Sequence, residues 1–167
     1  IDAPRKYVVD NLEYALNQKK TVNQETPSMY HLFYGDETGG PGTSLTFFEM
    51  PYVGSTYRGT NAITRIGLLV KNEEALTYWK KRFNQLEIPH EEFINYSGKK
   101  ALPCQDPDGL ELLLMDGAGE KLPSFWKTWD NSSVPKEYQI LGMGPVEMTA
   151  RRPKKLINML EDLFGYQ

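Results

Sequence analysis

One helix-starting pattern occurs three times in this chain of 167 residues, and the repeat limits the folds that the chain can adopt. The copies are Asp2-Ala3-Pro4 before KYVVDNLEYAL, Asn72-Glu73-Glu74 before ALTYWKKRF, and Arg152-Pro153 before KKLINMLEDLFG. In each copy, a capping residue or a proline precedes apolar residues at helical spacing. The helices begin about 70 to 80 residues apart, which is too far for a solenoid and suits one small α/β unit each.

Strand patterns lie between the helices in a consistent order. In the middle copy, NAITRIGLLV precedes the helix, and PHEEFINY, KALPCQ and LELLLMD follow it, separated by the turns SGK and DPDG. In the first copy, the strands that follow the helix are NQKKTVN, MYHLFYGD and TSLTFFEM. In the third copy, MGPVEMTA precedes the helix. The unit is strand, helix, strand, strand, strand, which predicts an α+β fold of repeated βαβββ modules.

The patterns divide the chain into four segments. Residues 1–60 form a first module without its opening strand, 61–116 a complete second module, 117–142 a linker, and 143–167 the start of a third module. We expect Trp126 and Trp129 to hold the linker against the body of the protein rather than to bind a ligand. The last helix would leave an apolar face uncovered, so we expect further chain or an oligomer partner, such as a second copy in a homodimer, to cover it.

Composition excludes two classes of partner. A net charge of −3, with lysines spread among acidic residues, gives no basic footprint for nucleic acid, and the cluster Arg151, Arg152, Lys154 and Lys155 is read as solvated surface. No apolar run approaches the roughly 18 residues that cross a bilayer, and the N-terminus has no signal-peptide pattern, so we expect no membrane partner. The single cysteine, Cys104, cannot form an internal disulfide and is read as an ordinary strand residue, which is typical of a cytoplasmic protein.

The repeated units, with GDETGGPGTSLTFF in one and DPDGLELLL in the next, resemble the vicinal oxygen chelate superfamily, which contains glyoxalases, bleomycin-resistance proteins and extradiol dioxygenases. The segments KKTVNQETPSMYHLFYGDETGGPGTSLTFFEMP, YRGTNAITRIGLLV and GMGPVEMTARR resemble, more narrowly, its ring-cleaving dioxygenases of hydroquinones and related phenols. The resemblance implies cupped, curved mixed sheets and a chain roughly twice as long, with four modules.

The resemblance also implies Fe(II) or Mn(II), held by two histidines and one carboxylate. Such a site leaves open positions on the ion for a deprotonated phenol and for dioxygen. A small phenolic substrate and dioxygen are therefore the implied partners, and extradiol-type ring cleavage is the implied reaction.

The family's metal positions, carried over one by one, give no metal ligand within this chain. In the superfamily a histidine often opens the first strand of a module, but that slot holds Arg65 in the second unit and Pro145 in the third. The carboxylate slot on the last strand falls on Leu113 in the second unit and on Thr46 in the first. In the ring-cleaving branch, the ligands lie on the opening strand of the first unit and in the fourth unit, neither of which is part of this sequence.

His31 is the candidate catalytic residue. It alternates with Phe33 on one strand face, and an imidazole there could act as a pocket acid or base beside a phenol, although a histidine bonded within the sheet is an alternative. His90 is expected at a solvated loop or strand end. Glu111 shares its strand face with Leu113 but is expected to be a solvated or paired edge charge. Glu49 lies beyond the usual ligand depth.

Two other functions stay open besides ring cleavage. One is metal-free binding and sequestration of an aromatic compound, as in bleomycin-resistance proteins. The other is a glyoxalase-like lyase, which Arg65 and Leu113 disfavour because they replace the ligands that this chemistry needs.

Overall fold

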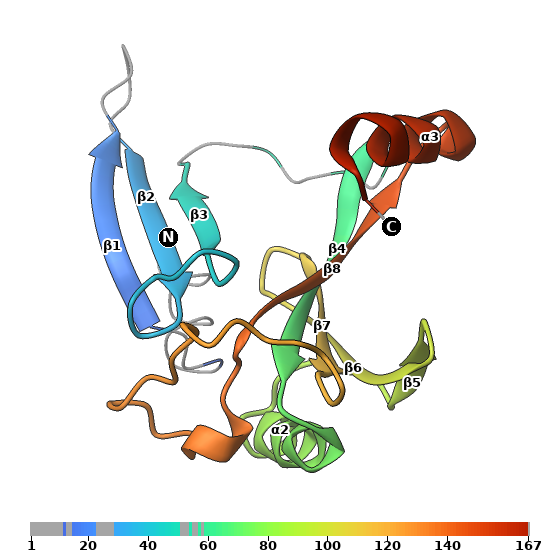
Figure 1. Cartoon of the computed structure of the whole chain (residues 1–167). Helices are drawn as coiled ribbons and strands as arrows, with labels where there is room; N and C mark the ends of the chain where they lie inside the picture. The colour runs from blue at the N-terminus through green and yellow to red at the C-terminus, as the bar shows by residue number, and fades with distance from the viewer. Residues whose placement is uncertain are drawn as a thin grey trace.

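The computed structural model describes residues 12, 15–22, 29–50, 54, 57 and 59–166, with the backbone alone at 15–22, 29 and 49. Its strands form two sheets (Figure 1), ordered β1 (Ala15–Val22), β2 (Met29–Gly35), β3 (Leu45–Glu49) in one, and β5 (Ile94–Tyr96), β6 (Lys99–Gln105), β7 (Glu111–Asp116), β4 (Ala62–Val70), β8 (Gly142–Thr149) in the other. The first expected helix lies outside the described residues apart from Leu12 and its predicted end. Leu16, expected as its last apolar residue, instead pairs with Tyr34 in a strand.

Residues 62–116 contain one strand, one helix and three further strands, in the predicted order. The elements are β4 (Ala62–Val70), α2 (Glu73–Gln85), β5 (Ile94–Tyr96), β6 (Lys99–Gln105) and β7 (Glu111–Asp116). The last strand, β7, lies parallel to the opening strand β4, which the α2 crossover makes possible. β5 is shorter than the predicted PHEEFINY, because His90 makes only an isolated bridge to Cys104.

Helix α2 begins where the sequence places its cap. The side chain of Asn72 accepts a hydrogen bond from the backbone N–H of Ala75 at 3.0 Å. Leu76, Trp79 and Phe83 are fully buried on one side of the helix. The indole N–H of Trp79 donates to the backbone carbonyl of Tyr138 at 2.6 Å, which ties the helix to the linker.

The first module contributes an antiparallel sheet of β1 (Ala15–Val22), β2 (Met29–Gly35) and β3 (Leu45–Glu49). The turn between β2 and β3 is organised by Asp36, whose carboxylate accepts from the backbone N–H of Gly40 at 2.8 Å. The same carboxylate accepts from the N–H of Lys127 in the linker at 2.8 Å. The turn therefore fixes the linker as well as the hairpin.

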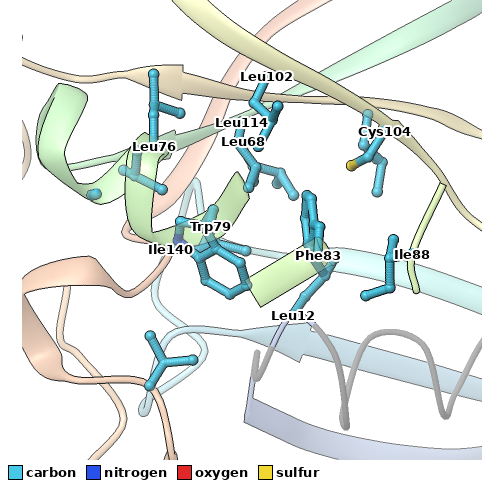
Figure 2. Close-up of a cluster of buried hydrophobic side chains, with 14 of the residues drawn as sticks. Leu12, Leu68, Leu76, Trp79, Phe83, Ile88, Leu102, Cys104, Leu114 and Ile140 are labelled. Atoms are coloured by element: carbon cyan, nitrogen blue, oxygen red, sulfur yellow. The ribbon is translucent and has the colours of Figure 1, made fainter. Parts of the chain in front are cut away.

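The larger of the two apolar clusters among the described residues joins the two sheets. Leu68 and Leu114 of the second sheet pack with the buried side of α2 (Figure 2). Leu32 and Tyr34 of β2 belong to the same buried cluster. Because successive strand residues point to opposite faces, the residues between them, such as His31 and Arg65, lie on faces turned away from this core. The two outer faces therefore cannot share one pocket across the core.

The third module begins with β8 (Gly142–Thr149), which pairs antiparallel with β4, and continues into α3 (Pro153–Phe164). In Figure 1, α2 and α3 lie at opposite ends of the long β4–β8 pair. Gly165 ends α3 in the left-handed conformation (φ 66°), as the sequence predicts. No residue of α3 is buried. Among the described residues, no helix is long and apolar enough to cross a membrane.

The linker packs closely on both sheets. It contains the short 3-10 helix η2 (Lys136–Tyr138), and Val134 and Ile140 beside it are buried in the shared core. The indole N–H of Trp126 donates to the carbonyl of Pro41 at 2.8 Å, and the ring packs against Gly142. Trp126 therefore holds the linker to the body, as predicted.

Candidate functional site

The outer face of the second sheet carries an ion network centred on Arg65. Its guanidinium contacts the Glu111 carboxylate, with Nη2 at 2.9 Å and Nε at 3.1 Å from the same oxygen. Its Nη1 lies 3.3 Å from a carboxylate oxygen of Glu147. The three residues are direct cross-strand neighbours on β7, β4 and β8. Arg65, predicted in the histidine slot, is therefore the cation between two carboxylates, and Glu111 is the paired charge that was expected.

Glu147 holds the network to its surroundings. It accepts from the hydroxyl of Tyr96 at 3.2 Å and from the hydroxyl of Thr64 at 3.2 Å. Burial, together with the neighbouring Glu147 charge and the hydrogen bond to it, raises the pKa of Tyr96, although the Arg65 charge opposes the shift. Tyr96 therefore keeps its proton near neutral pH and stays a donor to the carboxylate.

Two further positions at which the superfamily carries metal ligands, those of Leu113 and Pro145, are also occupied by side chains that cannot bind a metal. We call the outer face of the second sheet around Arg65 the cup. Leu113 is buried in a small apolar cluster with Leu69, Ala101 and Met115, which lies beside the ion network. Pro145 lies against Gly67, where an added side-chain carbon would be 2.7 Å from the Pro145 carbonyl oxygen. The residues of this cup do not fit a divalent metal, because the guanidinium occupies the charged centre and both carboxylates already bind it.

Two cavities flank the Arg65–Glu111 pair. One, of about 560 Å³, extends past Glu147, Asp108 and Tyr57. The other, of about 170 Å³, is lined by His90, Cys104 and Gln105. The pair lines both cavities, so it forms the wall between them.

The outer face of the first sheet is aromatic and surrounds His31. Its imidazole stacks on Phe48 of β3, with centroids 3.9 Å apart, and lies at the same distance from Phe33. Phe48 is 48% exposed, and Thr46 beside it is also exposed. The Nε2 atom of His31 is buried and has no hydrogen-bond partner within the described part of the chain. The predicted alternation of His31 and Phe33 on one face is confirmed.

The remaining candidates lie apart from His31. His90 is half-buried at the edge of β6, with Nδ1 2.7 Å from the carbonyl oxygen of Ile88. The side chain of Glu49 lies outside the described residues. Over the described residues, no three His, Cys, Asp or Glu side chains lie together as a metal site requires.

Sequence reasoning missed two residues of the Arg65 network, Glu147 and Tyr96. Glu147 could have been found from the repeat, because it lies on the opening strand of the third unit as Arg65 lies on that of the second. The sequence alone did not show that these two strands, β4 and β8, pair and so bring Arg65 beside Glu147. Tyr96 had no signal of its own in the sequence.

No family model matches the chain, but sequence relatives do. MhqA of Bacillus subtilis, named as a ring-cleaving dioxygenase, is 42% identical over 151 residues, which cover 89% of this chain and 46% of MhqA. The chlorohydroquinone/hydroquinone 1,2-dioxygenase of Sphingobium indicum is 28% identical over 166 residues, which cover 94% of this chain and 50% of that enzyme. The chain spans about half the length of the relatives that it matches.

Solved structures are also similar to this chain. A Bacillus subtilis protein described as a dioxygenase superposes with a TM-score of 0.82 at 27% identity, over 97% of this chain and 50% of that one. A glyoxylase/bleomycin resistance protein/dioxygenase domain from Frankia superposes with a TM-score of 0.56 at 13% identity, over 72% of this chain and 85% of that one, and shows the fold alone. By sequence, the chain matches about half the length of proteins named ring-cleaving dioxygenases, and it shares the fold of a glyoxylase/bleomycin resistance protein/dioxygenase domain.

Proposed function

We propose that the protein that carries this chain is a ring-cleaving, extradiol-type dioxygenase of hydroquinone- or catechol-like phenols. The observation that carries the proposal is the 42% identity to MhqA across 89% of this chain. Fe(II) or Mn(II), dioxygen and a small phenolic substrate are part of the proposal, with the metal held by segments outside this sequence. A cytoplasmic location is also part of it, and the one thiol, Cys104, is buried in β6.

The aromatic face around His31 supports a place for the phenol on the first module. Phe33 and Phe48 offer ring faces against which an aromatic substrate can stack. The buried Nε2 of His31 has no partner within the described residues, and an unsatisfied buried polar atom costs about 1–3 kcal/mol. A phenolic hydroxyl would satisfy it. We propose that His31 acts there as a pocket acid or base, exchanging a proton at Nε2.

The test is oxygen uptake by the full-length protein, loaded with Fe(II) and supplied with methylhydroquinone. His31→Gln is expected to lower kcat by about 10²–10⁴-fold, the usual range for a lost acid or base, while the metal content is unchanged. His90→Gln is the matched control, because His90 contacts the Ile88 carbonyl instead of the aromatic face, and it is expected to keep full activity.

A second candidate, metal-free sequestration of an aromatic compound, is favoured by the same exposed rings. It predicts tight binding of the phenol to the metal-free protein, without oxygen uptake after metal is added. A metal-loaded protein that binds methylhydroquinone and consumes no oxygen would contradict the dioxygenase proposal. A glyoxalase-like lyase would instead turn over a thiohemiacetal without consuming oxygen.

A further inference from the structure

On the outer face of the second sheet, the side chains of Glu111 and Glu147 contact one guanidinium, that of Arg65, and the hydroxyl of Tyr96 donates to Glu147. Arg65 on β4 lies between Glu111 on β7 and Glu147 on β8, each of which is its direct cross-strand neighbour. Both carboxylates contact the same guanidinium, at 2.9 and 3.3 Å. The arrangement places two anions around a single point, and that point is occupied by a side chain of this protein.

The surroundings hold the guanidinium in place. The side chains of Arg65, Glu111 and Glu147 are 25%, 18% and 37% exposed. Leu113 and Met115, which follow Glu111 on the same face of β7, are buried, and the hydroxyl of Tyr96 donates a hydrogen bond to Glu147. Because the site is partly shielded from water, two carboxylates there without a cation would repel each other and be poorly solvated.

We infer that the Arg65 guanidinium takes the place of a metal ion in this cup, so that an internal cation closes the cup to divalent metals. The Arg65–Glu111–Glu147 cluster sums to one negative charge, whereas the two carboxylates without Arg65 would sum to two and would form a latent divalent-cation site. This inference does not depend on the proposed dioxygenase activity, because it concerns the side of the second sheet that faces away from His31.

Thermal unfolding of the chain with and without MnCl₂ tests the inference. In wild type, any rise in Tm with Mn²⁺ is expected to be the same as in Glu111→Gln. Arg65→Met removes the charge and keeps an apolar stem of similar length. It is expected to have a lower Tm than wild type without metal and to gain a saturable rise in Tm with Mn²⁺ that wild type lacks.

Three further variants make the result specific. Arg65→Met with Glu111→Gln is expected to lose the Mn²⁺ response, because one of the two carboxylates is neutral. Arg65→Lys keeps a cation and is expected to stay insensitive to Mn²⁺. Arg65→Gln removes the charge but keeps amide donors, and it replaces Arg65→Met if that variant does not fold. Any Mn²⁺ that binds elsewhere raises Tm equally in wild type and in the variants.

Two outcomes would overturn the inference. One is a wild-type response to Mn²⁺ that Glu111→Gln abolishes, because the cup would then accept a metal with Arg65 present. The other is an absent response in folded Arg65→Met and Arg65→Gln, because the carboxylates would then not form a latent site.

Discussion

Asp36 accepts a hydrogen bond at 2.8 Å from the backbone N–H of Lys127, which lies 91 positions further along the chain. The other carboxylate oxygen of Asp36 accepts from the N–H groups of Thr38 and Gly40 within its own turn. One side chain therefore shapes the β2–β3 turn with one oxygen and anchors the linker with the other.

Asp36→Asn separates these two tasks. The amide oxygen can still accept within the turn, but the NH₂ group faces the Lys127 N–H and cannot accept from it. We expect a loss of about 1–2 kcal/mol in the free energy of unfolding, measured in urea, and a larger loss for Asp36→Ala. Asp130→Asn in the same linker is the control, because its ion pair with Lys136 is exposed and worth little. Equal effects at both positions would contradict the anchoring role.

The same carboxylate predicts a pH dependence. Burial alone would raise the pKa of Asp36, but the backbone donors of Gly40, Lys127 and Thr38 outweigh burial and lower it. A lowered folded-state pKa means that the stabilisation is present above the ordinary carboxyl pKa and is lost as the pH falls through the folded value. Urea unfolding from pH 7 to pH 2 should show a shallower acid decline in Asp36→Asn than in wild type. If the free energy of unfolding fell equally with decreasing pH in both proteins, the Asp36 carboxylate would not be the cause of the decline.

Asp106 predicts a pH dependence of stability opposite to that of Asp36. It lies in the DPDG turn, where one of its oxygens accepts from the N–H groups of Asp108 and Leu110. Burial raises its pKa above the usual range, although those backbone donors oppose the shift. Its ionised form is therefore less favourable in the folded protein, and stability should fall as the pH rises through the folded value.

Asp106→Asn is expected to be as stable as wild type at pH 7, or more stable by up to about 1 kcal/mol, because the amide oxygen keeps both bonds without a charge. The difference should disappear at low pH, where Asp106 is protonated. Asp108→Asn is the neighbouring control, since Asp108 is exposed. A large loss of stability at neutral pH would show that the charge itself is needed.

The ring of Trp126 leaves no space for a side chain at Gly142. A side-chain carbon at this position would overlap three atoms of the six-membered ring, although the backbone conformation itself suits any residue. Gly142→Ala is expected to lower the free energy of unfolding by about 1–3 kcal/mol and to change the tryptophan emission spectrum. Gly59→Ala has open space around the added carbon and should change stability by less than about 0.5 kcal/mol.

The apolar side of α3 is predicted to be covered by a second copy in solutions of this chain. Ile157, Leu163 and Phe164 are 49%, 72% and 65% exposed. Light scattering is expected to give the mass of a dimer for wild type and of a monomer for Leu163→Ser with Phe164→Ser. Lys155→Ser on the same helix serves as the control. A monomeric wild type at high concentration would rule the dimer out.

Local signals predicted much of the fold. Asn72 and the apolar stripe from Leu76 to Phe83 place α2, and Gly165 ends α3, because capping and periodicity act within a few residues. The alternation in MYHLFYG placed His31 and Phe33 on one face. The expected helix ran to Leu16 because its apolar spacing continues that far, but pairing with Tyr34 draws that residue into β1.

Long-range pairings were not predictable from one sequence. The contact between Arg65 and Glu147 depends on β8 lying beside β4, and the contact between Asp36 and Lys127 depends on how the linker folds back. The role of His31 in catalysis remains a prediction, because its buried Nε2 atom has no hydrogen-bond partner among the described residues.

The two sheets turn their polar and aromatic faces away from a common core, so substitutions on one face leave the packing behind the other unchanged. Each face is then free to evolve at its own pace. Substitutions of His31 or of the rings stacked on it could change which ligand is preferred, while the Arg65 salt bridges on the other sheet continue to stabilise the fold.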